Sequence, residues 1–307
     1  FDFVPVPVTA RLAAVGGVNV SLADRDASFF SSNPATTADT LRGIASASYQ
    51  YYVADIGHAF ISYAPYFKKL GTVRIGIQHM QYGSIQGYDD AGMETLVFDA
   101  SETALIVSKS HQVGNFRLGA SLKGIFSNLA GYRASGILAD LGGVFVHPER
   151  ELTIGLVVRN FGFVFGDQNA SSGQVPFDVQ TGVTLKPQHM PVRFSFTAFN
   201  LTQRDVSYYD PVSGKEKPAS LSKLLSHINF GTEILLHRNV NILVGYNYLL
   251  HQALKLERGG AGAGFTFGFS AAVRNFEFVF SRSTYVAGNA GYGFTVFADV
   301  NKLLKRG

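Results

Sequence analysis

The amino-acid sequence predicts an all-β protein, a transmembrane antiparallel β-barrel of about 14 strands with an N-terminal plug segment in its lumen. Three observations lead to this fold class. Charged residues are few, apolar residues alternate with polar or small ones from about residue 43 onward, and the connections are alternately short and long. A bacterial outer-membrane barrel has all three properties, because one face of each strand meets lipid and the two ends of the barrel carry different connections.

The composition favours a membrane protein that crosses with strands. Charged residues make up 16% of the 307 residues, whereas a soluble domain carries about 25%. No run of about 18 apolar residues could form a membrane helix, and the best candidate, ILLHRNVNILVGY, is interrupted by His, Arg and Asn. Cysteine is absent, which excludes disulfides and thiolate sites. The net charge of +4 is dispersed, so we expect no nucleic-acid binding.

The alternation has a period of two residues, which is the period of a strand. In FRLGASLKG, for example, Phe116, Leu118 and Ala120 lie on one face, and Arg117 and Ser121 on the other. VRFSF (192–196) and GFTFGFSAA (264–272) repeat this pattern. Such runs predict strands that begin near residues 43, 55, 71, 101, 115, 134, 151, 176, 191, 227, 240, 262, 274 and 291.

The connections differ in length by parity. The links after the second predicted strand and every second strand thereafter are short: FKKLG, HQVGN, HPERE, KPQHMP, HRNV and AVRN. The intervening links are mostly longer, and the longest cover 84–100 and 204–226. Tight periplasmic turns and longer extracellular loops are typical of outer-membrane barrels. We therefore expect an outer-membrane location with both chain termini in the periplasm and the long loops outside.

Catalytic and cofactor motifs are missing from the sequence. The eight histidines are scattered without i, i+2 or i, i+4 pairs, so no local metal site is predicted. No G-x-S-x-G elbow or phosphate-binding loop occurs. GGAGAGFTFG lacks the spacing of a dinucleotide loop and leads into a strand, where its glycines are expected to relieve crowding. We predict no catalytic, cofactor-binding or metal-binding residues, and hence no enzyme.

The lumen of so wide a barrel needs filling, and residues 1–42 are the predicted plug. VTARLAAVGG predicts a short helix that ends at two glycines, and Asn33 with Pro34 predicts a turn. Asp24 or Asp26 would face inward arginines, because buried carboxylates need such partners. Alternation places Arg74, Arg117, Lys123, Arg193, Glu277, Asn241 and Asn247 on the inner face. Residues 43–302 would form the barrel and 303–307 a periplasmic tail; the alternative for 1–42 is a loose periplasmic leader.

A family resemblance is carried by the same segment. ARLAAVGGVNVSLADRDASFFSSNPA is similar to the N-terminal plug of barrels related to the long-chain fatty acid transporters, the FadL-like superfamily, with Asp24, Asp26, Asn33, Pro34 and Ala35 as the matching residues. Within it, GYRASGILADLGGVFVHPERELTIGLVVRNFG and PFDVQTGVTLKPQHMPVRFSFTAFNL resemble the PorV/PorQ branch of Bacteroidetes. Length and loop layout are most similar to the PorQ-like members.

The resemblance implies a component of the type IX secretion system, in the complex that attaches secreted cargo to lipopolysaccharide. A PorQ-like barrel would hold a PorZ-like surface protein near a PorU-like sortase and a PorV-like barrel, and its loops 84–100 and 204–226 would be the docking candidates. The alternative is a FadL-like transporter of hydrophobic small molecules. In such a transporter, FGFVFG (161–166) would line a pocket near the outer strand ends.

Overall fold

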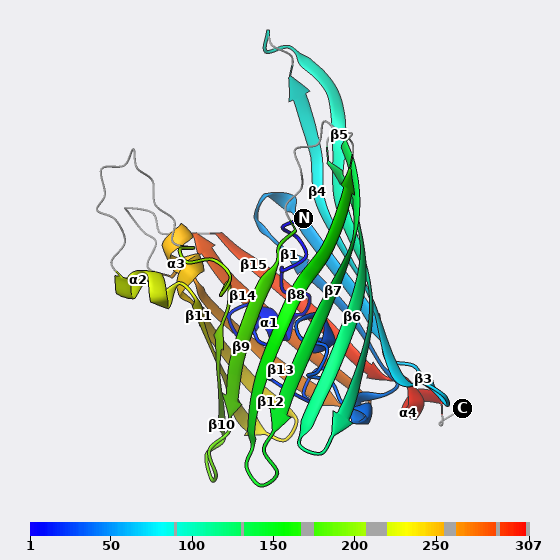
Figure 1. Ribbon diagram of the computed structural model, residues 1–307. Coiled ribbons are helices and arrows are strands. Elements are labelled where there is room, and N and C mark those ends of the chain that lie inside the picture. The colour runs from blue at the N-terminus through cyan, green and yellow to red at the C-terminus, as the bar shows by residue number, and fades with distance from the viewer. Residues whose placement is uncertain are drawn as a thin grey trace.

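The computed structural model describes residues 1–88, 91–129, 132–166, 175–206, 220–254, 262–286 and 289–304. Its sheet has 15 strands, of which one, β3, has two residues and pairs only with β4. The other 14 are antiparallel, and the ring closes where β2 pairs with β4 (Figure 1). The predicted all-β barrel of about 14 strands is therefore confirmed.

The strands are β1 (Ile44–Tyr51), β2 (Gly57–Tyr63), β3 (Tyr66–Phe67), β4 (Gly71–Tyr88), β5 (Glu94–Val113), β6 (Phe116–Leu129), β7 (Tyr132–Val146), β8 (Leu152–Gly166), β9 (Asp178–Leu185), β10 (Val192–Ala198), β11 (Ile228–His237), β12 (Val240–Asn247), β13 (Phe265–Val273), β14 (Phe276–Val286) and β15 (Asn289–Asp299). The helices are α1 (Ala10–Ala14), α2 (Ser220–Leu225), α3 (Tyr248–Leu254) and α4 (Val300–Leu304). Thirteen of the 14 predicted starts lie within three residues of the observed ones; β5 begins at Glu94 instead of near 101.

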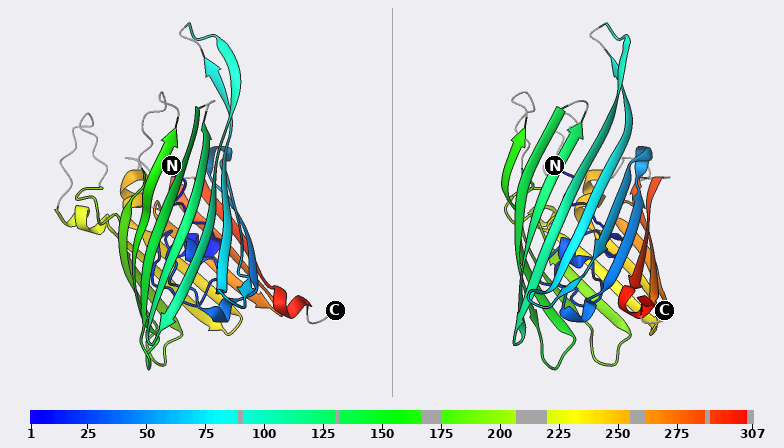
Figure 2. Two further views of the ribbon diagram at one scale, coloured as in Figure 1. Left: turned by 45° about the vertical axis from the view of Figure 1, so that its right-hand side comes forward. Right: turned by 90° about the vertical axis from the view of Figure 1, so that its right-hand side faces the viewer.

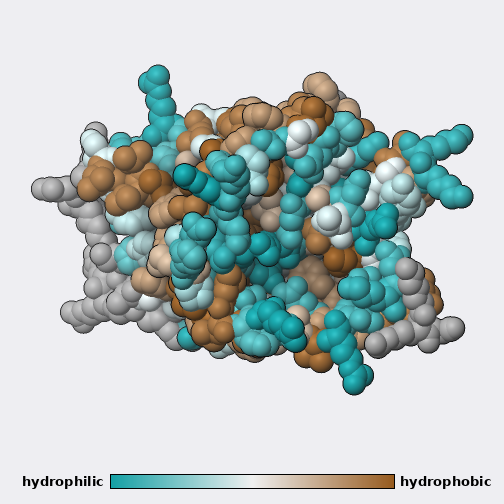
Figure 3. Space-filling view, turned by 90° about the horizontal axis from the view of Figure 1, so that it is seen from below, coloured by the Kyte–Doolittle hydropathy of each residue, from teal (hydrophilic) through white to brown (hydrophobic). Residues whose placement is uncertain are grey.

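The alternation in the sequence becomes an apolar outer face and a buried inner face. On β6, Leu118 and Leu122 are 62% and 58% exposed, whereas Arg117 and Ser121 are 3% and 4% exposed. A row of outward Leu, Ile and Phe side chains is stable only if lipid covers it. Figure 3 looks onto the end with the short turns, where polar residues gather over the end and apolar ones lie mostly toward the outline. Among the described residues, no helix has the length and apolar character to cross a membrane.

The prediction of a loop over residues 84–100 is wrong for most of that range. Most of it continues β4 and β5, which pair with each other up to Tyr88 and Glu94. The resulting hairpin rises beyond the neighbouring strands (Figures 1 and 2). Alternating residues such as Leu96 and Phe98 give it strand character, although it was predicted as a long link between two strands. Of the predicted loop 204–226, residues 207–219 lie outside the described part of the chain, and 220–225 form α2.

The prediction that both chain termini lie at the same end of the barrel does not fit the structure. The N-terminus lies inside the barrel toward the end with the long hairpin (Figure 1), and Phe1 packs against the buried cluster that contains Phe3 and Val4. Helix α4 lies at the opposite end, next to the start of β1 (Figure 1). The physical reason is that the first residues, FDFVPVPV, are mostly apolar, and Phe3, Val4 and Val8 are buried inside the barrel.

Candidate functional site

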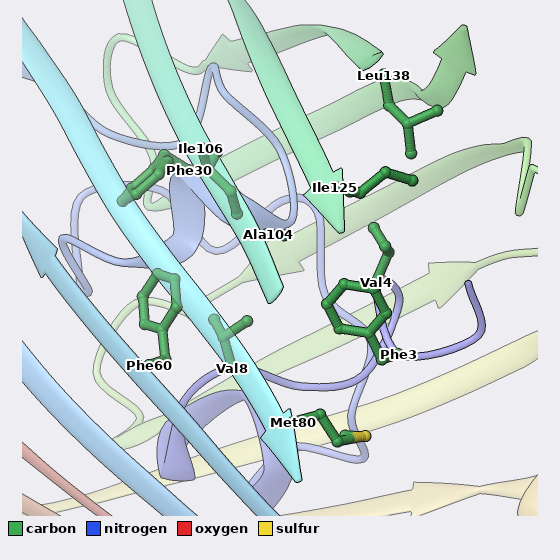
Figure 4. Close-up of a cluster of buried hydrophobic side chains, with 10 residues drawn as sticks. All are labelled: Phe3, Val4, Val8, Phe30, Phe60, Met80, Ala104, Ile106, Ile125 and Leu138. Atoms are coloured by element: carbon green, nitrogen blue, oxygen red, sulfur yellow. The ribbon is translucent and has the colours of Figure 1, made fainter. Parts of the chain in front are cut away.

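Residues 1–42, here called the N-terminal segment, lie inside the barrel (Figure 2). Their apolar side chains form a core with the wall, in which Phe3, Val4, Val8 and Phe30 pack with Phe60, Met80, Ala104, Ile106, Ile125 and Leu138 (Figure 4). The inner face of a barrel is usually polar because it meets water. Here these wall positions are apolar because they meet the segment instead.

Inward-facing glycines of the wall lie where the backbone of the segment comes closest. A Cβ atom on Gly119 would lie 2.6 Å from the Ala35 nitrogen, and one on Gly268 would lie 2.6 Å from the Ala14 Cβ. Gly155, Gly231 and Gly245 face Val20, Val15 and Gly16 in the same way. Since a close-packed interior leaves no room for such overlaps, glycine is required at these positions for the segment to lie against the wall. Gly268, the second glycine of GFTFGF, therefore leaves room for α1.

Helix α1 is short and buried on every side. Thr9 caps its first turn by accepting a hydrogen bond from the Leu12 nitrogen, and the helix ends at Gly16 and Gly17, which have φ angles of +95° and +88°. The wall holds both ends: the Ala10 nitrogen donates to Thr295 Oγ1 over 2.8 Å. At the other end, Thr266 Oγ1 donates to the Ala14 oxygen, also over 2.8 Å.

Arg11 is the charged centre of the lumen, although it sits on this otherwise apolar helix. Its Nη1 donates to Glu233 Oε1 of β11 over 2.8 Å, and its Nη2 pairs with Glu277 of β14. Its Nε lies 3.8 Å from Asp26 Oδ2, and Glu233 also pairs with Arg193 of β10. Arg11 therefore connects the segment to two strands of the wall.

Asp26 is fully buried, and burial raises the pKa of its carboxyl from 3.8 to about 7. The nearby Arg11 and the Ser28 backbone nitrogen, which donates to Oδ1 over 2.7 Å, oppose that rise. With Asp26 protonated, two arginines face two glutamates, and the buried charges of this cluster balance.

Asp24 binds the opposite wall. Arg117 of β6 donates from Nη1 and Nη2 to the two Asp24 oxygens over 2.8 and 2.9 Å. Asp24 Oδ1 also accepts from the Ala38 nitrogen over 2.9 Å. Its φ of +59° is left-handed, a conformation that Asp and Asn tolerate better than most residues. The structure thus brings one predicted plug carboxylate against one predicted inward arginine, while Asp26 contacts an arginine of the segment itself.

Asn33 and Pro34 form a fully buried turn. The Ala35 nitrogen donates to Asn33 Oδ1 over 3.0 Å, closing the turn, and Asn33 Nδ2 donates to the Val20 oxygen over 2.8 Å. The turn rests on two wall glycines, Gly119 of β6 and Gly142 of β7.

The other predicted inward residues differ in what they contact. Arg74 donates from Nη2 to the Ala38 oxygen over 2.7 Å and therefore holds the segment. Asn247 also contacts it, donating to the Gly16 oxygen over 3.2 Å. Lys123 contacts two wall residues instead of the segment. Its Nζ lies 2.6 Å from Asp140 Oδ2 in an ion pair and donates to Asn160 Oδ1 over 2.8 Å. Asn241 likewise donates to a wall residue, Ser270 Oγ, over 3.1 Å.

Charged residues of this arrangement that were not predicted include Arg11, Glu233 and Asp140. The sequence holds a signal for each. Arg11 is the only charge in the apolar run FVPVPVTARLAAV, and Glu233 and Asp140 stand at inward positions of alternating strands. Among the described residues, no group of three or more His, Asp or Glu side chains is placed to hold a metal ion.

The described residues enclose cavities in the lumen, and two of them are sizeable. One, of about 350 Å³, lies toward the hairpin end and is lined by Val6, Val18, Phe177, Phe199, Leu249 and Leu250, with Arg159 and Asp178 as charged residues. The other, of about 460 Å³, lies toward the short turns and is lined by Arg11, Asp24, Arg25, Arg193, Arg238 and Glu277 among others. Leu12, Leu22 and Phe29 of the segment form a further buried cluster. The first cavity is mainly apolar, and the second is mainly charged.

The run FGFVFG does not line the apolar cavity as the transport reading predicted. Arg159 and Asn160 form a bulge opposite Asp140, where the register of β7 and β8 shifts. Beyond the bulge, Phe163 and Phe165 are 76% and 59% exposed on the lipid face.

Comparison with solved structures identifies the fold. The chain superposes on the "TodX monoaromatic hydrocarbon channel deltaS2 mutant" with a TM-score of 0.56 and 13% identity, over 97% of this chain and 99% of that one. A FadL homologue of Pseudomonas aeruginosa gives a TM-score of 0.51 and 10% identity, over 95% and 98%. The chain is a FadL-like outer-membrane barrel in fold. No family model matches the sequence, and no curated protein matches it. The PorV/PorQ assignment stays a prediction.

Proposed function

We propose that this barrel is a sealed outer-membrane anchor of the type IX secretion system. Its N-terminal segment would plug the lumen, and its extracellular side would hold a PorZ-like surface protein. A PorU-like sortase and a PorV-like barrel would be neighbours, in a membrane rich in lipopolysaccharide. The observation that carries the proposal is the lumen occupied by a segment bound to opposite walls. The PorQ-like sequence pattern supports the choice of secretion system.

The contacts of the segment explain why an occupied lumen favours an anchor. To open the barrel, the Arg11 pairs with Glu233 and Glu277 and the Arg117 pair with Asp24 would have to break. Breaking a buried ion pair costs about 3–5 kcal/mol when one partner stays buried. The apolar core around Phe3 and Phe30 would also be lost. A channel needs this opening in its working cycle, whereas an anchor does not.

The experiment is an affinity isolation from native outer membranes in mild detergent. The tagged barrel is compared with an unrelated outer-membrane barrel that carries the same tag, and a heat-dependent shift in gel mobility verifies that both are folded. We expect a surface-exposed protein to accompany this barrel alone, in a near-equimolar amount. If a folded barrel brings down no surface protein, the anchor is contradicted.

A second function, transport of hydrophobic small molecules, is favoured by the apolar cavity near the hairpin end. Its volume of about 350 Å³ is that of a small ligand site, and Phe177 and Phe199 provide aromatic walls. The structural neighbour described as a monoaromatic hydrocarbon channel has the same fold. In this reading the segment would shift to connect the cavity with the other end of the lumen.

The absence of tryptophan offers a direct test of that second function. The variant Phe177→Trp places a single tryptophan in the cavity wall, and Phe163→Trp places one on the lipid face as a control. Saturable quenching of the first variant by a brominated aromatic compound, without saturation in the second, would favour transport. Equal, linear quenching in both variants would favour the anchor.

A further inference from the structure

The hairpin of β4 and β5 extends beyond the barrel wall. The pairing of β2 with β4 ends at Gln81, and the pairing of β5 with β6 ends at Ser101. The β4–β5 pair continues for seven more residues of β5, from Ala100 to Glu94, which corresponds to about 23 Å. Within the described residues, no strand lies beside this part of β5 on the side away from β4. Its outer edge is therefore open to a further strand.

A bulge separates the hairpin from the wall. The β4–β5 register shifts between Gln81 and Ser84, and Gly83 has a φ of +76°. Such a bulge bends a strand pair and strengthens its twist, so the hairpin is directed away from the lipid-covered wall (Figure 2).

The hairpin exposes apolar side chains on both faces. Leu96 and Val97 are neighbours in a strand and point to opposite faces, yet they are 74% and 60% exposed. Met93 is 66% exposed. Below the bulge, outward apolar residues are covered by lipid, but at this distance from the wall they are not. A two-stranded hairpin is marginally stable alone, and an open edge with apolar residues is a template for another strand.

The charge of the hairpin restricts what can bind it. Residues 75–108 contain Asp89, Asp90, Glu94, Asp99 and Glu102 but no Lys or Arg, in a chain whose net charge is +4. Glu102 is buried and accepts a hydrogen bond from Tyr82, whereas Glu94 and Asp99 are exposed. An acidic hairpin repels the phosphates of lipopolysaccharide, and it repels a second copy of itself. It attracts a basic segment.

We infer that this hairpin is the docking element of the barrel and that it binds a basic β-strand of a surface protein along the outer edge of residues 96–100. The inference rests on the proposed anchor function and names the surface that would perform it. Backbone hydrogen bonds of an added strand would provide affinity. Leu96 and Val97 would be covered in the complex, and Glu94 and Asp99 would select Lys or Arg on the added strand.

The test uses the complex isolated from native membranes. In one variant, residues 83–99 are replaced by Asn-Gly, so that Tyr82 and Ala100 flank a tight turn and the Gln81–Ser101 pairing is kept. In a second variant, Glu94→Lys is combined with Asp99→Lys. Glu149→Lys, in an exposed turn at the opposite end, is the control for altered charge. We expect the first two variants to recover at least tenfold less partner and the control to recover as much as the unaltered barrel.

Hydrogen exchange and photo-crosslinking identify the mode of binding. Amides 96–100 should exchange at least tenfold more slowly in the isolated complex than in the barrel alone. A photoreactive residue at 97 should crosslink to a partner peptide with an excess of Lys and Arg. Full recovery of the partner by the variant without 83–99 would overturn the inference while the anchor function stood. So would a crosslink to lipopolysaccharide or to a second barrel. Recovery of no surface protein by the unaltered barrel would overturn the anchor function itself.

Discussion

Arg117 holds Asp24 with two hydrogen bonds, of 2.8 and 2.9 Å, across 93 residues of sequence. The Arg117 side chain is 4% exposed and that of Asp24 is 34% exposed. The pair joins the middle of the N-terminal segment to β6, at the wall opposite Glu233 and Glu277. Substitutions of Asp24 can therefore separate two contributions to the free energy of unfolding: that of the ion pair and that of the left-handed backbone at Asp24.

Asp24→Asn removes the charge but suits the left-handed backbone of φ +59°. Because Arg117 is left buried without its counter-charge, we expect unfolding in urea to require about 1–3 kcal/mol less free energy. Asp24→Ala should cost more, since it also strains the backbone and loses the bond from the Ala38 nitrogen. Equal stability of Asp24→Asn and the unaltered protein would show that the pair contributes nothing.

The wall glycines provide a second prediction. Gly119→Ala places a methyl group against the backbone of Pro34 and Ala35, so the Asn33–Pro34 turn must move away from β6. We expect a loss of about 1–3 kcal/mol, as for an overpacked core. The segment should also become more sensitive to protease. In Gly124→Ala on the same strand, the new methyl group meets its nearest neighbour, Phe126, at an ordinary 3.8 Å. Equal protease sensitivity of the two variants would contradict this role of Gly119.

The barrel was predictable from the sequence because alternation and connection length are local signals. Both are read along one chain segment, and they placed β4, β11 and β12 within one residue of their observed starts. The exception was β5, where Asp and Gly residues in the hairpin concealed seven residues of strand. Local propensity indicated a loop there, whereas pairing with β4 decided the structure.

The contacts inside the lumen were only partly predictable. Alternation places Arg117, Arg193 and Glu277 on the inner face, but it cannot tell which of them meets the segment and which meets another wall residue. Arg11 and Glu233 are 222 residues apart, and their pairing depends on the depth at which α1 lies in the barrel. The role of the inward glycines Gly119, Gly155 and Gly231 was not predicted for the same reason, since it depends on a backbone from elsewhere in the chain.

Arg11 offers a test of whether the segment seals the lumen. Arg11→Met keeps much of the side-chain volume but leaves Glu233 and Glu277 without this partner, so we expect about 3–5 kcal/mol of destabilisation. The segment should then detach more often and raise the conductance of the barrel in a planar bilayer. Lys123→Met breaks a buried pair, with Asp140, that does not involve the segment. It should destabilise the barrel comparably without raising its conductance. If both variants conduct equally, Arg11 is not what closes the barrel.

Asp26 predicts how stability depends on pH. Because burial raises the pKa of its carboxyl from 3.8 to about 7, the folded protein retains a proton that the unfolded chain has lost between these values. The contribution of Asp26 to the free energy of unfolding therefore falls as pH rises from about 4 to 7, by at most about 1.4 kcal/mol per pH unit. Above pH 7 the carboxyl is ionised in both states, and its contribution no longer changes. Asp26→Asn should remove this slope, and Glu149→Gln, in an exposed turn, should leave it in place. The midpoint of urea unfolding at several pH values measures the effect, and an unchanged slope in Asp26→Asn would assign the pH dependence to another group.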